Sequence, residues 1–306
     1  MSIGCGNCVF ISVVRDFPLY ERLVRRNPVN AGGRFVALDN RTENLSITSR
    51  YNSVLDGWDY GTETWFVFLH EDFQFLEPVG DVLAHADAGR IYGVVGPSST
   101  RPGSDVLFSL NSERDGGRLG FYGKPFKKPV AVLTTDCNCL IVHSSLVQRY
   151  RLRFDEKLLF DLYAEDFEIN AREKFGVGTF VIPVRCRHWS FGHMGDRFFR
   201  QRRYLLEKYA SASRVYRTTT RQLIGPLRMV VRAVCDNRRW IRRDWLRRIG
   251  HFFWYVKFSR DGYMRIRVFG MRLKFRYASA EEWMNAVSSS QIGGECGIIR
   301  GDGDDS

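Results

Sequence analysis

The sequence lacks two features that would place the protein in a membrane or in an oxidising compartment. No apolar run approaches the roughly 18–20 residues that a helix needs to cross a bilayer. The seven cysteines are odd in number and irregularly spaced, and no secretory signal is recognisable. These absences exclude an integral membrane helix and a disulfide framework, so they predict reduced thiols in a cytoplasmic protein.

Zinc-ligand spacing and a phosphate-binding loop are also missing. Cys5 and Cys8 form an isolated pair, and Cys137 and Cys139 are too closely spaced to supply the second pair of ligands of a structural zinc site. No glycine-rich loop of the Rossmann or Walker type follows the first apolar run. If a nucleotide binds, side chains and a metal ion must therefore hold it. The lack of a Gly- and Arg-rich loop also argues against sugar nucleotidyl transfer.

Positive charge is abundant, and it is unevenly placed. The net charge is +12, and the segment 200–276 holds roughly 22 basic and 4 acidic side chains. This segment therefore carries the positive field, which predicts an anionic surface or partner there. Hydrophobic residues make up 44% and aromatic residues 14% of the 306 residues, which predicts a substantial core. The length suits one large domain with an appendage, or two modest domains.

Three apolar runs alternate with helical patterns in the N-terminal part of the chain. Residues 9–14, 34–39 and 65–70 form short strand-like runs, and the run at 9–14 has no polar alternation, as expected of a buried parallel strand. The alternation predicts an α/β fold with a mainly parallel sheet flanked by helices and joined by right-handed crossovers. Further strands are expected at three later apolar runs, 91–96, 130–135 and 179–184. The turn-rich stretch 97–120 is predicted to be a mobile loop.

Polar side chains follow each of the first three predicted strands. Asp16 comes after the first, Asp39 ends the second and is followed by Asn40, and His70 ends the third, with Asp72 two positions later. Ligands of open α/β sheets lie beyond the carboxyl ends of the strands, so these residues predict a polar site there. His70 and Asp72 are two positions apart on an extended segment, so both can face one cation. A carboxylate suits Mg²⁺ or Mn²⁺, and Mn²⁺ also accepts an imidazole.

A second acidic cluster opens a predicted helix later in the chain. The apolar stripe that ends at Gly176 places Glu165 and Asp166 in the first helical turn, where the helix dipole favours their ionised forms. The strand at 179–184 then leads to His188. Asp166 is thus a candidate general base, and His188 a candidate metal ligand. The alternative is that the carboxylates only cap the helix and that His188 is an ordinary surface or core histidine.

The order of these motifs resembles glycosyltransferase family 2, which has the GT-A fold. Within that family the chain is similar to the branch typified by the streptomycin-biosynthesis glycosyltransferase-like proteins. The likeness covers about residues 9–195. It is carried mainly by five segments, 39–40, 68–73, 154–156, 165–168 and 188–192.

The resemblance implies inverting transfer of a sugar from a nucleotide-sugar donor, with a divalent cation as cofactor. It gives Asp166 the role of general base, and His70, Asp72 and His188 the role of metal ligands. The predicted donor-binding residues are Asp16, Asp39, Asn40, Asp136 and Glu165. Two positions depart from the family pattern, because His70 and Glu168 stand where the motifs have Asp. The first departure leaves metal dependence open.

The sequence changes character from about residue 204. Arg and Trp are interleaved with aliphatic residues through 238–258, as in amphipathic helices that bind an anionic membrane surface. A helix packed on the catalytic domain is the alternative, and nucleic-acid binding is disfavoured because no recognition motif is present. Strict alternation in 263–277 around a central Phe-Gly predicts a β-hairpin. The Ser-, Gly- and Asp-rich end is predicted to be disordered.

The sequence therefore predicts a GT-A catalytic domain (1–203), basic amphipathic helices plus a β-hairpin (204–287) and a disordered tail (288–306). The predicted function is that of an inverting glycosyltransferase, acting on a cell-envelope glycan or a lipid-linked acceptor. It is expected in the cytoplasm, peripheral to the inner face of the plasma membrane. The rival hypothesis is a non-catalytic GT-A-like module that binds membranes or polyanions through its basic C-terminal region.

Overall fold

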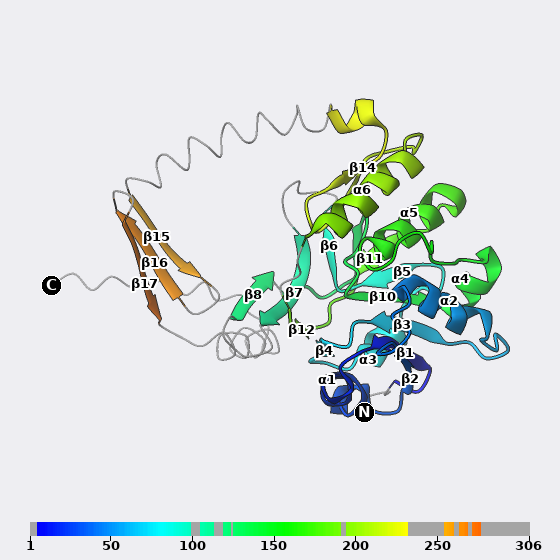
Figure 1. Cartoon of the computed structure of the whole chain (residues 1–306). Helices are drawn as coiled ribbons and strands as arrows, with labels where there is room; N and C mark the ends of the chain where they lie inside the picture. The colour runs from blue at the N-terminus through cyan, green and yellow to red at the C-terminus, as the bar shows by residue number, and fades with distance from the viewer. Residues whose placement is uncertain are drawn as a thin grey trace. The chain divides into compact units, whose positions relative to one another are not determined.

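A computed structural model of the chain describes residues 5–98, 105–112, 119–123, 125–190, 194–231, 254–259, 263–268 and 271–276. The chain divides into two compact units (Figure 1). The first unit consists of 1–118 and 122–240, and the second of 119–121 and 241–306. The first unit thus runs past the domain boundary predicted at residue 203.

A seven-stranded sheet forms the centre of the first unit. Five strands run in one direction, and β10 and β9 run against them. In spatial order the strands are β2 (Arg34–Asp39), β1 (Cys8–Val14), β3 (Trp65–Leu69), β10 (Cys139–His143), β5 (Ile91–Gly93), β11 (Thr179–Val181) and β9 (Val130–Val132). The predicted α/β class with a mainly parallel sheet is confirmed, and the architecture is consistent with the GT-A fold that the resemblance implies.

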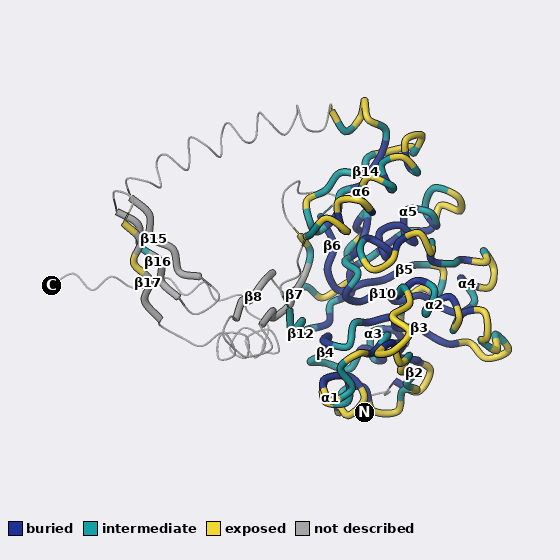
Figure 2. The backbone as a smooth tube through the Cα atoms, viewed as in Figure 1, coloured by how far each residue is buried: buried dark blue, intermediate teal, exposed yellow. Residues whose placement is uncertain are grey.

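Alternate residues of the central strands feed two separate hydrophobic clusters, because side chains alternate between the faces of a strand. Phe66 and Phe68 of β3 pack in one cluster, and Trp65 and Val67 pack in the other. The first cluster contains side chains of α2 (Ile47–Asp56), α4 (Ser144–Tyr150), α5 (Tyr163–Phe175) and α6 (Asp196–Lys208). The second contains side chains of α1 (Phe17–Tyr20), the π-helix η1 (Glu21–Arg25) and α3 (Val79–Leu83). The central strands are accordingly among the most buried parts of the chain (Figure 2).

The next strand after β3 belongs to a second sheet. Its strands are β4 (Phe73–Phe75), β12 (Cys186–His188), β7 (Asp105–Ser112) and β6 (Val95–Pro97), in that order. The loop predicted for 97–120 is therefore wrong at β7, which pairs with β12 and β6. The single strand predicted for 91–96 is divided between the two sheets, as β5 and β6. Short strands shared between sheets give too few residues for a pattern to predict them.

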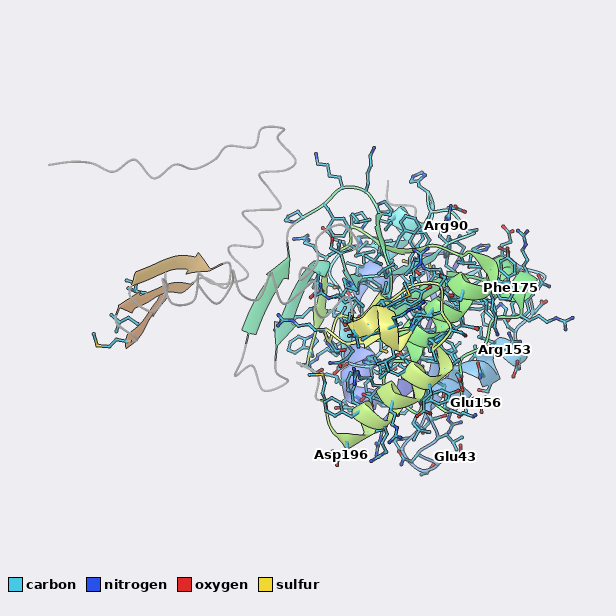
Figure 3. The ribbon with its side chains drawn as sticks, turned by 90° about the horizontal axis from the view of Figure 1, so that it is seen from above. Glu43, Arg90, Arg153, Glu156, Phe175 and Asp196 are labelled. Carbon is cyan, nitrogen blue, oxygen red and sulfur yellow. The ribbon has the colours of Figure 1, made fainter. Side chains whose placement is uncertain are left out.

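Helix boundaries follow the local signals. Helix α5 ends at Phe175, and Gly176 adopts a left-handed conformation with φ of 69° that closes the helix. Phe175, the last residue of α5, lies at the periphery of the unit (Figure 3). Helix α6 begins at Asp196. Ser46 caps α2 by accepting a hydrogen bond from the backbone N–H of Ser49. Among the helices that the structure describes, none has the length and apolar character of a bilayer-spanning segment.

The remaining elements are short. The 3-10 helix η2 (Pro28–Asn30) precedes β2, and β13 (Tyr216–Arg217) pairs with β14 (Leu223–Ile224) after α6; β8 spans Leu119–Gly123. In the second unit, β15 (Trp254–Ser259), β16 (Tyr263–Val268) and β17 (Met271–Arg276) form an antiparallel sheet. Val268 lies opposite Met271, so the predicted hairpin is confirmed. The helical segment predicted through 238–258 is wrong at 254–258, because these residues pair with β16 as part of β15. The rest of that segment and the predicted tail lie outside the described residues.

Gly93 provides a test of packing between β5 and the segment around Thr135. A Cβ atom at Gly93 would lie 2.5 Å from the Cβ of Thr135, far inside van der Waals contact. We expect Gly93→Ala to displace Thr135 and lower the free energy of unfolding by about 1–3 kcal/mol. Gly57→Ala is the control, because its Cβ would meet the carbonyl oxygen of Ser53 at an ordinary 3.5 Å. Urea unfolding of both variants checks the prediction, and equal stabilities would contradict it.

Candidate active site

A cleft of about 1340 Å³ opens at the carboxyl ends of β1, β2 and β3. Its walls come from the strand ends, the start of α2, the start of α5 and the segment that follows β12. This is the edge of the sheet where the polar residues after the first three strands predicted a ligand site. Six of the nine predicted site residues line it: Asn40, His70, Asp72, Asp136, Glu165 and His188.

His70, Asp72 and His188 lie together on one side of the cleft. β12 pairs with β4 so that His188 is opposite Phe73, which brings it beside the segment that leaves β3. One ligand atom from each of the three side chains lies within 4.8 Å of the others. His188 Nε2 is 3.4 Å from an Asp72 carboxylate oxygen, and both side chains are largely buried. The sequence prediction that these three residues converge is therefore matched by their placement.

The chemistry of this cluster fits a divalent cation. Two imidazole nitrogens and one carboxylate oxygen are donors that Mn²⁺ accepts, whereas Mg²⁺ prefers oxygen alone. Burial lowers the pKa of His70, although Asp72 opposes the shift. A neutral imidazole is the form that binds a metal ion. His70, Asp72 and His188 are thus the residues that would hold the cation.

Glu165 faces the same cleft from the first turn of α5. Its side chain is almost fully buried, and burial raises its pKa to about 8, with the nearby Asp136 acting in the same direction. The thiol of Cys137 donates a hydrogen bond to Glu165 Oε2 at 3.0 Å. A buried carboxyl with a raised pKa that faces a cleft is a typical proton acceptor in catalysis.

Asp136 lies on the segment that carries Cys137. Thr219 Oγ1 donates to Asp136 Oδ2 at 2.7 Å, and the backbone N–H of Asn138 donates to Oδ1 at 3.1 Å. The preceding residue, Thr135, donates its N–H and its hydroxyl to the fully buried Glu168 carboxylate. Burial raises the pKa of Glu168 to about 8. Glu168 therefore braces the Asp136 segment against α5.

Asp166, the predicted general base, is not among the residues that line the cleft. Its carboxylate accepts a hydrogen bond from Lys208 Nζ, with a shortest distance of 2.7 Å, and another from the Tyr209 hydroxyl at 2.7 Å. Both partners come from the end of α6, on the side of α5 that Glu165 does not face. Asp166 is thus part of an ion pair with Lys208, whereas the adjacent Glu165 lines the cleft.

The predicted nucleotide-contacting acids are also engaged elsewhere. Asp16 caps α1 by accepting from the backbone N–H of Leu19 at 3.0 Å. Asp39 is exposed and paired with Arg41, whose hydrogen bonds lower the pKa of Asp39 to about 2. Neither acid lines the cleft. Their predicted role in donor binding is therefore without support from their placement.

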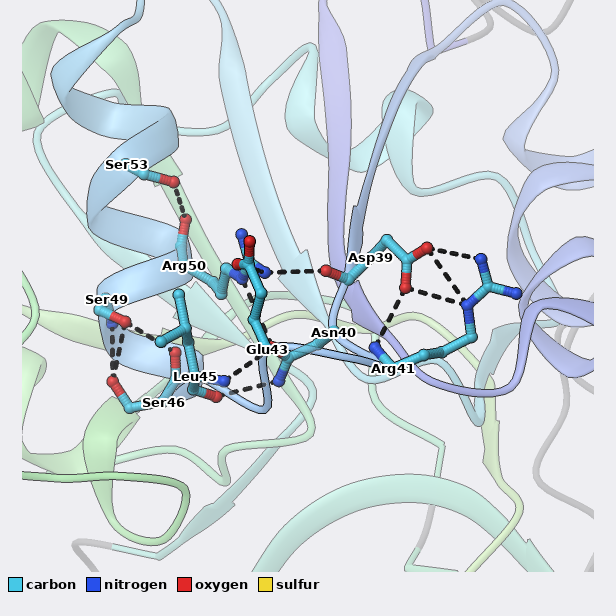
Figure 4. A network of polar contacts seen from close by, with 9 residues as sticks. All are labelled: Asp39, Asn40, Arg41, Glu43, Leu45, Ser46, Ser49, Arg50 and Ser53. Atoms are coloured by element: carbon cyan, nitrogen blue, oxygen red, sulfur yellow. Dashed lines mark hydrogen bonds and ion pairs between the residues drawn. The ribbon is translucent and has the colours of Figure 1, made fainter.

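Asn40 lines the cleft, but its amide group holds the loop before α2. Its Nδ2 donates to the carbonyl of Leu45, and its Oδ1 accepts from the N–H of Leu45, both at 2.9 Å (Figure 4). Arg50 adds a hydrogen bond to the carbonyl of Asp39 and an ion pair with Glu43. Asn40 therefore shapes this end of the cleft.

Several cleft residues were not predicted as site residues. Glu71 lies inside the His70–Asp72 motif and accepts hydrogen bonds from the backbone N–H groups of Arg15 and Asp16, which ties β1 to the end of β3. Cys137 directly follows Asp136, a predicted site residue, so its place in the cleft could have been predicted from the sequence. Thr219 had no such signal, because it lies beyond the predicted catalytic domain.

No family model and no curated protein matches the chain. Similar folds are found among solved structures. One is the crystal structure of GalNAc-T7 with UDP, GalNAc and Mn²⁺, with 8% identity, a TM-score of 0.42, and coverage of 66% of this chain and 48% of that chain. Another is the crystal structure of S. aureus TarS 1–349, with 12% identity, a TM-score of 0.41, and coverage of 67% and 66%.

Both neighbours are GT-A glycosyltransferases. The chain spans about half the length of the first and just under two thirds of the second. The case for a function of this chain therefore rests on the side chains of the cleft.

Proposed function

We propose that the protein is a metal-dependent glycosyltransferase that moves a sugar from a nucleotide-sugar donor to an acceptor hydroxyl. The observation that carries this proposal is that the cluster of His70, Asp72 and His188 and the buried carboxyl of Glu165 line the same cleft. A cation site and a separate proton acceptor are the two groups that departure of a nucleotide diphosphate and attack by a hydroxyl require. The resemblance to family 2, including its inverting chemistry, is part of the proposal.

The cation would supply positive charge for the leaving diphosphate when it is bound. The protein's own contribution at that side is a fixed set of donors: His70 and Asp72 at the end of β3 and His188 at the end of β12. Asp136 is held toward the cleft by Thr219, and we place it beside the donor sugar or the acceptor.

Glu165 takes the role of general base in this proposal, in place of Asp166. Its carboxylate is the one that reaches the cleft, and it can accept the proton that the acceptor hydroxyl releases as it attacks. Asp166 is held by Lys208 and Tyr209 and does not line the cleft. One general base, Glu165, that activates the attacking hydroxyl is what direct displacement with inversion at the sugar's anomeric carbon requires.

The rim of the cleft supports an acceptor that is partly apolar, such as a lipid-linked glycan of the cell envelope. Leu159, Phe160 and Met194 line the cleft and are 43–52% exposed. The guanidinium of Arg197 lies 4.8 Å from the centre of the Phe160 ring and is paired with the Asp161 carboxylate at 2.7 Å, so its charge is already matched. The exposed apolar side chains of this rim suit the apolar chain of such an acceptor.

Peripheral attachment to an anionic membrane surface on the cytoplasmic side completes the proposal. Leu227 and Val231 are 77% and 53% exposed, and Arg228 lies between them in the sequence. Exposed aliphatic side chains next to arginine suit an anionic lipid interface. The same residues also favour the rival function, that of a non-catalytic module that binds membranes or polyanions. That rival function does not explain why the candidate metal ligands and Glu165 line one cleft.

Calorimetry with UDP, GDP and dTDP, each with and without Mn²⁺, tests the proposed function. We expect Mn²⁺-dependent binding of one nucleotide, and a donor screen by nucleotide release should then identify the sugar. Asp72→Asn should lose the Mn²⁺-dependent part of the binding, whereas the exposed Asp87→Asn should retain it. If no nucleotide binds and no donor is turned over, the non-catalytic alternative is favoured.

A further inference from the structure

The hydroxyl of Tyr163 lies between a candidate metal ligand and the segment that carries Cys137. Tyr163 is the first residue of α5 and is fully buried, with its ring packed near those of Tyr51 and Phe154. Its oxygen is 3.1 Å from Nε2 of His70 and 2.5 Å from the backbone carbonyl oxygen of Cys137. Two hydrogen bonds thus meet at one phenol oxygen.

The direction of both hydrogen bonds follows from the valence of the groups. A carbonyl oxygen can only accept, so the single proton of the Tyr163 hydroxyl is donated to Cys137. Toward His70 the phenol oxygen can then only accept. Nε2 of His70 must therefore carry the proton of this hydrogen bond. In a neutral imidazole the other nitrogen, Nδ1, is then the one with a free lone pair.

We propose that Tyr163 is a positioning residue that holds His70 in the Nε2–H tautomer and assigns Nδ1 as its metal-binding atom. The inference rests on the proposed function only in that a divalent cation is taken as the occupant of the His70, Asp72 and His188 cluster. Hydrogen bonds of this kind to the second ring nitrogen fix both the tautomer and the orientation of metal-binding histidines.

Two further contacts position His70 without selecting its tautomer. The backbone N–H of His70 donates to the carbonyl of Asn138 at 3.2 Å, which places the residue but not its ring. Phe160 stacks on the imidazole with ring centres 5.5 Å apart, which fixes the ring plane but does not distinguish the two nitrogens. Among the hydrogen bonds described for this ring, the one with the Tyr163 hydroxyl makes that distinction.

The test compares Tyr163→Phe with the matched control Tyr60→Phe. Tyr60 also donates its hydroxyl to a backbone carbonyl, that of Leu55 at 2.9 Å, and it does not line the cleft. In metal-free protein labelled with ¹⁵N-histidine, the His70 signal, assigned with His70→Asn, should show the Nε2–H tautomer in the parent and in Tyr60→Phe. In Tyr163→Phe it should show a mixture of tautomers.

Mn²⁺ titration followed by electron paramagnetic resonance gives the second readout. Tyr163→Phe should bind Mn²⁺ about 10–100-fold more weakly than the parent, since that is the usual effect of losing such a partner, and Tyr60→Phe should match the parent. A parent with the Nδ1–H tautomer, or unchanged tautomer and affinity in Tyr163→Phe, would overturn the inference. Failure of the parent to bind any nucleotide would count against the proposed function and leave the tautomer measurement intact.

Discussion

Glu165→Gln is expected to reduce sugar transfer by about a hundredfold to ten-thousandfold, which is the usual contribution of a general base. The carboxamide has nearly the same shape, but it cannot accept the acceptor's proton. It can still accept a hydrogen bond from the Cys137 thiol, which now donates to Glu165 Oε2 at 3.0 Å. Nucleotide binding should therefore persist while turnover falls. Steady-state kinetics and calorimetry on the same preparation measure the two effects separately.

Asp166→Asn is the matched control, because it changes the adjacent acid in the same helical turn. Asp166 is paired with Lys208 and does not line the cleft, so this variant should lose stability and keep its turnover per folded molecule. The opposite outcome, an active Glu165→Gln and an inactive but folded Asp166→Asn, would return the role of base to Asp166. The family motif alone predicts that opposite outcome.

The pH dependence of transfer gives an independent measure of the same group. The pKa of Glu165 is raised to about 8, by burial first and also by the charges of Asp136 and Glu168, while the thiol of Cys137 opposes the shift. A general base acts when it is ionised, so kcat/KM should rise with pH and level off above about 8. The residual activity of Glu165→Gln should not show this rise of kcat/KM with pH. An acid limb near pH 4–5, the ordinary range for Glu, would contradict the assignment.

The central sheet could be predicted because its strands carry their own signal. The runs at 9–14, 34–39 and 65–70 are rich in apolar residues, and they become β1, β2 and β3 within a residue of the predicted bounds. The polar residues after them mark the edge where the cleft lies. The pattern of the run at 140–147 does not decide between strand and helix, because the run contains parts of both, β10 followed by α4.

The division of labour between Glu165 and Asp166 could not be predicted from the sequence. Neighbouring residues on a helix point about 100° apart, so two adjacent acids face different directions. Which one faces the cleft depends on Lys208 and Tyr209, which arrive from α6 more than forty positions later. The same holds for Thr219, whose contact with Asp136 depends on the path of the chain after α6.

Lys208→Met is expected to lower the free energy of unfolding by about 2–4 kcal/mol, because it leaves a buried carboxylate without its countercharge. Asp166 is only 2% exposed, and the ammonium group of Lys208 also pairs with Asp155 at 2.6 Å. Burial alone would lower the pKa of Lys208, but these two carboxylates raise it. Burial raises the pKa of Asp166, while the charge and the hydrogen bond of Lys208 oppose that shift. Removing Lys208 therefore leaves the buried Asp166 carboxyl without its countercharge. Urea unfolding monitored by circular dichroism measures the loss.

The double variant Asp166→Asn with Lys208→Met should recover most of that stability, because it removes both buried charges. The carboxamide that replaces the Asp166 carboxylate can still accept the hydrogen bond from the Tyr209 hydroxyl. Arg203→Met serves as the control on the same helix. Its ion pair with Glu207 is exposed, so its loss should change stability by no more than about 1 kcal/mol. Equal stabilities of Lys208→Met and Arg203→Met would mean that Asp166 is not committed to this ion pair. Asp166 would then be free to turn toward the cleft, and the assignment of Glu165 as the base would lose its structural reason.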